Sequence, residues 1–179
     1  MARKFRRRYY KRKTARWAPN IAKIRDSISA TPGEFGANST LAFNPAQSTG
    51  SVSQTYTAKN FDITFTIEAG SANSANYIEG VTVYIMYVPQ GMTVGNDYYQ
   101  LHPEYILNYK YIGSPANQQG SGTTGTETQQ YQPIRVRTRM ARKLQTGDQI
   151  VLYVNGTNTD SANQTLYVDG LVRWWTKAN

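Results

Sequence analysis

The chain has no cysteine and a single histidine, His102, among its 179 residues. The lack of cysteine excludes disulfide bonds and thiol catalysis, and it is compatible with a reducing compartment. One histidine without cysteines cannot supply a clustered metal-ligand set, and no Ser–His–Asp order supports nucleophilic catalysis. A two-carboxylate glycosidase using Glu68, Glu79 or Glu104 is the remaining enzymatic alternative. The sequence therefore predicts no enzyme, no metal site and no cofactor.

The chain also lacks a long apolar run. The longest, at 81–88, is far too short to span a bilayer, so we expect no membrane insertion. The basic start is followed by more basic residues and not by an apolar stretch, which predicts no secretory signal. The length indicates one domain that can bury a sizeable core.

Acidic residues are absent from residues 1–25, which carry eleven lysines and arginines. The rest of the chain holds nine basic and eleven acidic residues, so the net charge of +9 comes from this start. Dense like charge with little apolar surface predicts a disordered arm over 1–25 that becomes ordered against a polyanion. Residues 26–179 are then the folded domain.

This arm has the composition of a nucleic-acid-binding segment. Its cations can neutralise phosphates without a sequence code, and its aromatic rings can stack on unpaired bases, which favours single strands. The residues expected to contact nucleic acid are Arg3, Lys4, Arg6, Arg7, Arg8, Tyr9, Tyr10, Lys11, Arg12, Lys13, Arg16 and Trp17. A nuclear localisation signal, bound by an import receptor, is compatible with this role and is also the plainer alternative. Membrane-surface binding is disfavoured because the aromatics follow no helical stripe.

The pattern of the body predicts β-structure. Strands are expected at 61–68, 80–88, 104–112, 134–140, 150–154 and 166–175, with weaker signals at 40–43 and 51–57. A hairpin is expected over 134–154, a polar loop over 155–164, an exposed loop over 116–130, and a helical turn over 97–102 capped by Asp97. Seven or eight strands with almost no helix favour an all-β, antiparallel, eight-stranded jelly roll. An OB-type barrel needs only about five strands and leaves segments unexplained.

Two further patterns concern surfaces. Arg135, Arg137 and Arg139 alternate with apolar residues, which predicts a strand with one basic face. With Arg142 and Lys143 they could form a second basic surface toward nucleic acid or a neighbouring subunit; the alternative is a solvated strand face.

Trp174 and Trp175 are adjacent, so in a strand they point to opposite faces. One is expected in the core. The other would lie at a subunit interface, or in a second hydrophobic layer of the same domain.

Four segments resemble one family: VTVYIMYVPQGM (81–92), HPEYILNYKYIGSP (102–115), RMARKLQTGDQIVLYVNGTNT (139–159) and GLVRWWTKAN (170–179). They look like the capsid proteins of small circular single-stranded DNA viruses that encode a replication initiator, the circovirus-like CRESS-DNA group. The resemblance extends from about residue 60 onward, and ARKLQTGD (141–148) and VRWWTKAN (172–179) are its most specific parts.

The resemblance implies a viral capsid-type jelly roll that self-assembles into a T=1 icosahedral shell of about sixty subunits. It implies packaging of circular single-stranded DNA by an inward-facing arm, here Arg3 to Arg16, which can double as a nuclear localisation signal. The expected locations are the virion and, during assembly, the host nucleus.

Two rival hypotheses remain. A single-stranded nucleic-acid-binding module that forms no shell would carry aromatic and basic residues on the same strand face. The Arg135 to Arg139 strand has no interleaved aromatics, which makes this alternative weaker. A lectin-type jelly roll with its sequons, Asn38, Asn155 and Asn163, in loops would leave the basic start without a role.

Overall fold

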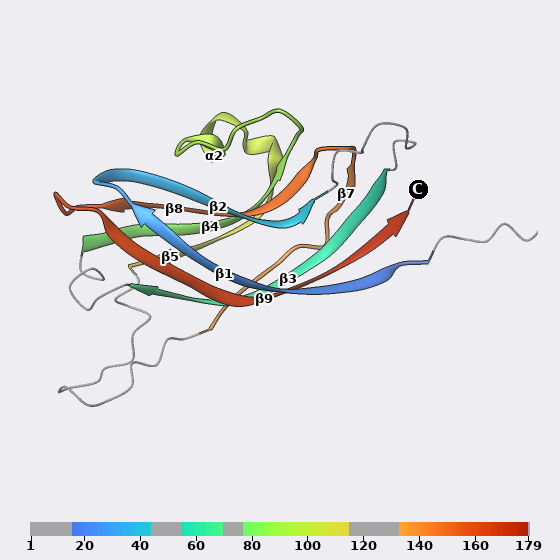
Figure 1. The fold of residues 1–179 in the computed structure, drawn as a ribbon, viewed down its shortest axis with the longest axis horizontal. Helices are drawn as coiled ribbons and strands as arrows, with labels where there is room; N and C mark the ends of the chain where they lie inside the picture. Colours follow the sequence, from blue (N-terminus) through green and yellow to red (C-terminus); the bar gives the residue numbers. More distant parts are fainter. Residues whose placement is uncertain (1–15, 44–54, 70–76, 115–132, 179) are drawn as a thin grey trace, which may run out of the picture.

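The computed structural model describes residues 16–43, 55–69, 77–114 and 133–178. Within these ranges the chain is all-β, with two antiparallel sheets packed face to face as a sandwich (Figure 1). This arrangement is compatible with a jelly roll. In Figure 1 one sheet, with β1, β3 and β9, forms the lower layer, and the other, with β2, β4 and β8, lies above it.

The lower sheet has five strands in the order β1-β9-β3-β6, and β7 also pairs with β3. Its strands are β1 (Ala18–Ala30), β3 (Tyr56–Ala69), β6 (Ile134–Arg137), β7 (Ala141–Leu144) and β9 (Gln164–Ala178). The upper sheet has the order β2-β8-β4-β5. Its strands are β2 (Gly33–Phe43), β4 (Ile78–Val88), β5 (Ile106–Gly113) and β8 (Gln149–Asn158).

The core between the sheets is built by the period-two pattern of the strands. In β3, Phe61, Ile63 and Phe65 are each at most 1% exposed, and the residues between them face outward. The opposite sheet contributes buried aliphatic residues such as Val83 and Leu152. Because successive side chains of a strand alternate between faces, this pattern places the polar set of β3 on the outer surface of the lower sheet.

A second apolar cluster lies on the outer face of the upper sheet. Tyr84, Met86 and Tyr153 are buried there, covered by the segment that holds α2 (Tyr98–Leu101) and η1 (Pro103–Tyr105). Figure 1 shows α2 above this sheet. This second layer explains why 80–88 is apolar on both faces, as expected of a strand enclosed in a core.

Several expected elements are confirmed with longer bounds. The strands predicted at 61–68, 80–88 and 166–175 are β3, β4 and β9, and the weak signal at 40–43 is the end of β2. The helical turn is α2, but Asp97 makes no side-chain hydrogen bond as its cap. The loop predicted at 116–130 lies outside the described residues.

Other expectations are wrong. Residues 18–25 do not belong to a disordered arm: they form the first part of β1, which pairs with β9 from Ala18↔Thr176 onward. The predicted 134–154 hairpin does not exist, because β6 and β7 pair with β3 whereas β8 lies in the other sheet. The described residues hold nine strands. Two of them were not predicted: β1, and β7, which follows β6 after that strand ends at Arg137, inside the run predicted as one strand at 134–140. The weak signal at 51–57 gives no strand of its own in the described residues, because β3 begins at Tyr56.

Asn155 corrects the expected loop at 155–164. It lies within β8, is 7% exposed, and donates to the carbonyl of Phe35 at 3.0 Å. Of the other sequons, Asn38 lies in β2. Within the described ranges, no helix is long and apolar enough to cross a bilayer.

We expect Gly170→Ala to lower the free energy of unfolding by about 1–3 kcal/mol. A Cβ at Gly170 would lie 2.4 Å from the Thr64 carbonyl oxygen and 2.5 Å from the Phe65 Cβ, both in the adjacent strand β3. Urea denaturation of the purified variant measures the loss. Gly95→Ala is the matched control, because its Cβ would meet a single carboxylate oxygen at 3.3 Å. Equal stability of both variants would contradict the close approach of β9 and β3.

Candidate nucleic-acid interface

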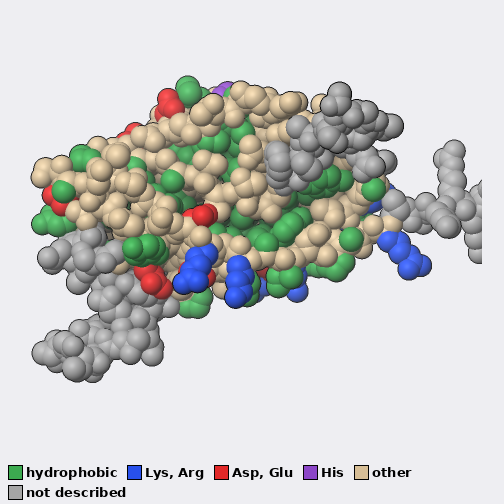
Figure 2. All heavy atoms as spheres, in the orientation of Figure 1, with side chains coloured by type: hydrophobic (Ala, Val, Ile, Leu, Met, Phe, Trp, Pro, Cys, Tyr) green, Lys and Arg blue, Asp and Glu red, His purple; other side chains and the backbone are tan. Residues whose placement is uncertain are grey.

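The outer face of the lower sheet gathers most of the positive charge in the described part of the chain. Strand alternation and register place nine of the twelve described lysines and arginines on this surface, which we call the basic face. They are Lys23, Arg25, Lys59, Arg135, Arg137, Arg139, Lys143, Arg173 and Lys177. The same surface carries three acidic residues: Asp62, Glu68 and Asp169. Figure 2 shows lysine and arginine side chains along the lower edge of the molecule, which is the side on which Figure 1 draws this sheet.

Four of the five residues predicted to form a second basic surface lie on the basic face. Arg135 and Arg137 are exposed on β6, with Ile134 and Val136 buried between them. Arg139 follows β6 and lines the same hollow as Arg137. Lys143 is exposed on β7.

Arg142 does not share this face. It is paired with Ala58, which is fully buried, so its side chain points toward the interior. There its Nη2 donates to the Glu104 carbonyl at 3.1 Å, and its guanidinium lies 5.7 Å from the centre of the Tyr87 ring. Arg142 therefore joins β7 to η1 and is not part of the basic face.

Asp62 lies at the centre of an arginine cluster built from three strands. Arg135 donates two hydrogen bonds to its carboxylate, from Nε to Oδ1 at 2.8 Å and from Nη2 to Oδ2 at 2.7 Å. Arg137 Nε and Arg173 Nη2 each lie 3.5 Å from Oδ2. The register explains the meeting, since Asp62 is paired with Arg137 on one side and Arg173 on the other.

The cluster keeps a positive surplus. The hydrogen bonds from Arg135, together with the charges of all three arginines, lower the pKa of Asp62 below its usual value although burial opposes this. The carboxylate therefore stays ionised and balances one of the three positive charges. Arg137 and Arg173 are 63% and 54% exposed, so donors of both remain open to an incoming anion.

A hollow of about 470 Å³ lies beside this cluster. It arises where two ladders are interrupted: the β3–β9 register shifts between Lys59 and Asp62, and β3 changes partner from β6 to β7. At the break Asn60 has φ 55°, the one positive φ of a non-glycine residue in the described ranges. Asparagine tolerates this left-handed conformation better than most residues.

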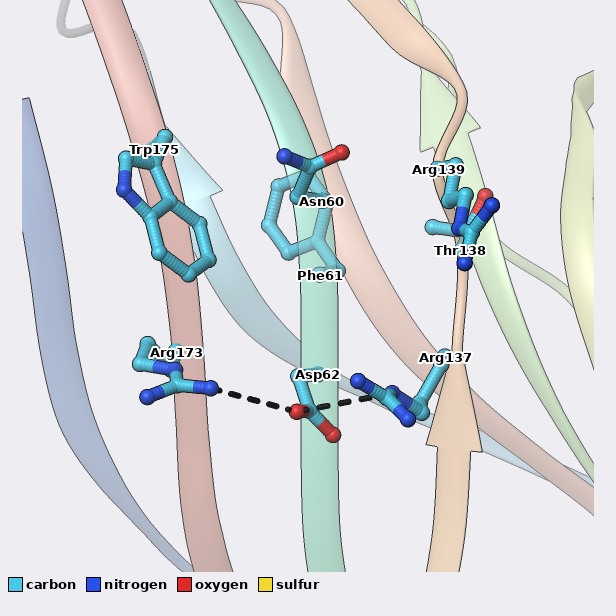
Figure 3. A pocket seen from close by; sticks show the side chains of 8 residues that line it. All are labelled: Asn60, Phe61, Asp62, Arg137, Thr138, Arg139, Arg173 and Trp175. Atoms are coloured by element: carbon cyan, nitrogen blue, oxygen red, sulfur yellow. Dashed lines mark ion pairs between the residues drawn. The ribbon is translucent and has the colours of Figure 1, made fainter. Parts of the chain in front are cut away.

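Figure 3 shows how side chains surround the hollow. Trp175 of β9 stands on one side and Arg139 on the other, with Asn60 between them. Arg137, Asp62 and Arg173 form a row beneath these three. Cationic, carboxamide and aromatic groups therefore converge on one space.

Aromatic rings also lie on the basic face. The Arg173 guanidinium is 5.2 Å from the centre of the Trp175 ring, and the Lys59 ammonium is 3.7 Å from that of Trp17. The strand that carries Arg135 and Arg137 has no aromatic residue of its own, as the sequence shows, but the sheet face to which it belongs carries Trp17 and Trp175. Trp175 belongs to β9 and Trp17 precedes β1. The sequence of β6 therefore gives no sign that aromatic rings share a face with Arg135 and Arg137.

The two adjacent tryptophans point to opposite faces, as predicted. Trp174 packs against the main core and stacks on Phe61, with ring centres 6.2 Å apart and planes at 5°. Trp175 faces outward into the hollow. Trp174 is therefore the core residue of the pair.

The predicted arm is described only at its end. Arg16 is exposed, and Trp17 is half-buried beside Lys59. The predicted contact residues from Arg3 to Lys13 lie outside the described residues. The contact with Trp17 places the start of the described chain on the basic face.

The residues considered for catalysis are dispersed. His102 packs beside Tyr98 and Tyr105, and its Nδ1 is 3.3 Å from a carboxylate oxygen of Glu104. Glu68 lies in the lower sheet, whereas Glu79 lies in the upper one. In the described ranges no group of three or more His, Cys, Asp or Glu residues could hold a metal ion.

No protein-family model and no curated protein matches this sequence.

Proposed function

We propose that this chain is a viral capsid protein that packages single-stranded DNA. Its basic N-terminal residues and its basic face together bind the phosphate backbone, and copies of the sandwich associate into a closed shell. The observation that carries the proposal is the gathering of nine of the twelve described cations on one sheet face. Neutralising phosphates with such a surface releases counterions and requires no base sequence.

The winding of the chain supports a jelly roll of the capsid type. Counting β6 and β7 as one position, because both pair with β3, gives eight positions in two four-membered rows. The chain crosses between sheets at nearly every step, and β4 and β5 are the consecutive strands that stay in the same sheet. Jelly rolls have eight strands in two packed sheets and are common in viral shells.

The shell is proposed on the resemblance of 81–92, 102–115, 139–159 and 170–179 to circovirus-like capsid proteins. By that resemblance it is a T=1 particle of about sixty copies. We place the protein in the virion and, during assembly, in the host nucleus, which it reaches through an import receptor that binds the basic start.

The test is negative-stain electron microscopy of the full-length protein, with the nucleic acid content measured by ultraviolet absorbance. We expect uniform round shells that contain nucleic acid. Deleting residues 2–16, which hold nine of the eleven basic residues of 1–25, should remove most of that nucleic acid while circular dichroism stays unchanged. Small oligomers that fail to assemble even with added single-stranded DNA would contradict the shell. Equal nucleic acid in the truncated protein would contradict the role of the arm.

A second candidate function is a single-stranded nucleic-acid-binding module that forms no shell. The observation in its favour is the placement of Trp17 and Trp175 among the cations of the basic face. Stacked aromatics beside positive charge are the usual device of such modules. The same microscopy separates the two candidates, because the module would bind DNA as a monomer or small oligomer.

A further inference from the structure

We propose that the hollow between β3, β6 and β9 binds one nucleotide unit of a single-stranded nucleic acid. Its phosphate would lie against Arg137, Arg139 and Arg173, and its base would stack on Trp175. This inference rests on the proposed nucleic-acid-binding function and assigns it a defined subsite in the folded domain, separate from the basic N-terminal residues.

The first argument is charge. Arg135 already satisfies both oxygens of Asp62, at 2.7 and 2.8 Å, while Arg137 and Arg173 reach the carboxylate only at 3.5 Å. Their planar guanidinium groups therefore retain donors suited to a second anion. In the described part of the chain, no ion pair engages Arg139. The residual charge fits a phosphate, which brings several acceptor oxygens to one place.

The second argument is the aromatic wall. Trp175 lines the hollow opposite Arg139 and is half-buried (Figure 3). The nearby Arg173 guanidinium, 5.2 Å from the ring centre, holds the side chain in place. A flat π-surface next to phosphate-binding cations suits a nucleobase, and stacking tolerates any base. A sulfated polysaccharide would use the cations but has no planar aromatic base for π-stacking on the indole.

The third argument is shape. The volume of about 470 Å³ falls within the range of about 300–1,000 Å³ common to small-ligand pockets. The hollow exists because β3 breaks its ladders at Asn60, which adopts φ 55°. Thr138 fixes the other side, since its amide donates to the Phe61 carbonyl at 2.8 Å. A backbone irregularity held by its neighbours is a feature of binding sites.

The first test maps contacts on the full-length protein. An oligothymidylate in which one thymine is replaced by 5-iodouracil is bound and photocrosslinked, and the attached peptide is identified by mass spectrometry. We expect a crosslink at Trp175. Crosslinks confined to residues outside the hollow, such as Tyr9, Tyr10 or Trp17, would overturn the proposal.

The second test measures affinity for an unmodified labelled oligothymidylate by fluorescence anisotropy. Trp175→Ala should weaken binding about ten-fold, and Trp175→Phe, which keeps a ring, should restore most of it. Arg173→Gln should lower the slope of log affinity against log salt by about one. Tyr111→Ala and Lys110→Gln are matched controls on β5 of the opposite sheet and should leave binding unchanged.

Asp62→Asn should change the affinity for oligothymidylate in the opposite direction to Trp175→Ala. Removing the one carboxylate of the cluster should tighten oligothymidylate binding about three-fold while lowering thermal stability. A purely structural role of Asp62 would lower stability without tighter binding, which would count against the subsite. If heparin oligosaccharides displaced oligothymidylate equally well from wild type and from Trp175→Ala, the proposal would also be overturned, because the indole would then contribute nothing to binding of the base.

These results separate the subsite from the proposed function. DNA-filled shells with no Trp175 crosslink, and with wild-type affinity in Trp175→Ala, would refute the subsite alone. Trp175-dependent binding by a protein that forms no shell under any condition would retain the subsite and refute the shell.

Discussion

Replacing Asp148 with alanine is expected to lower the free energy of unfolding by about 2–4 kcal/mol. Asp148 is 4% exposed and lies in the turn that carries the chain from β7 in one sheet to β8 in the other. Its carboxylate accepts hydrogen bonds from the backbone amide of Gln145 at 2.8 Å and that of Gln90 at 3.0 Å. It also accepts one from the Tyr87 hydroxyl at 2.7 Å.

The large effect follows from what the alanine leaves behind. Two backbone N–H groups and a half-buried hydroxyl would lose their acceptor, and unpaired buried donors cost more than the net worth of the bonds. Urea denaturation measures the loss. Asp97→Ala is the matched control, since Asp97 makes no side-chain cap hydrogen bond to α2, and it should change stability by less than about 0.5 kcal/mol. A similar small change in Asp148→Ala would show that the turn does not depend on the carboxylate.

Raising the pH above about 10 is expected to unfold the protein steeply. Burial raises the pKa of Tyr84, Tyr87 and Tyr153, and it raises that of Tyr98 to about 12. These four residues lie in or against the second apolar cluster. The hydrogen bond to Asp148 adds to the shift of Tyr87.

The sign follows from which state releases protons first. Tyrosines of the unfolded chain ionise near pH 10, whereas Tyr98 in the fold holds its proton until about pH 12. The contribution of these buried tyrosines to the free energy of unfolding is thus complete below pH 10. For Tyr98 it is lost as the pH rises from about 10 to about 12. Each tyrosine with a fully shifted pKa contributes a slope of about 1.4 kcal/mol per pH unit.

Denaturation midpoints measured from pH 9 upward, with tyrosinate absorbance recorded in parallel, check this result. Tyr98→Phe should make the decline shallower, because one titrating group is removed while the ring stays. Its hydroxyl bond to the Tyr87 carbonyl is long, at 3.3 Å, so the loss at neutral pH should be small. Unchanged midpoints across this range would contradict burial of the four hydroxyls.

The sequence predicted strands well where one local pattern was sufficient. The alternation from Phe61 to Glu68 specifies a half-buried strand, and the apolar run ending at Val88 specifies a strand covered on both sides. The same period-two signal was available in β1, where Ala22, Ile24 and Ile28 alternate with polar residues. Charge density alone predicted disorder there. Burial of the apolar side chains and backbone pairing with β9 outweigh the repulsion between the basic residues.

Partners across the fold could not be predicted from local patterns. Arg135 and Asp62 are 73 residues apart, and only the antiparallel register of β3 and β6 brings them together. The hairpin predicted over 134–154 rested on nearness in sequence, whereas the chain leaves one sheet for the other at Asp148. The position of Trp175 beside the arginines could not be predicted either. The hollow is formed by three strands, and the sequence of any one of them does not indicate it.

The contact between Trp17 and Lys59 fixes the point from which the basic N-terminal residues extend. Under the proposed function, a strand of DNA bound by those residues is tethered within a short distance of the basic face. In such a linkage the second contact is governed by an effective concentration, which reaches the millimolar range for short flexible connections. Weak sites on the sheet can then be occupied at DNA concentrations far below their individual dissociation constants. A variant in which the basic N-terminal residues start from another place on the domain, with every charge retained, would lose part of this avidity.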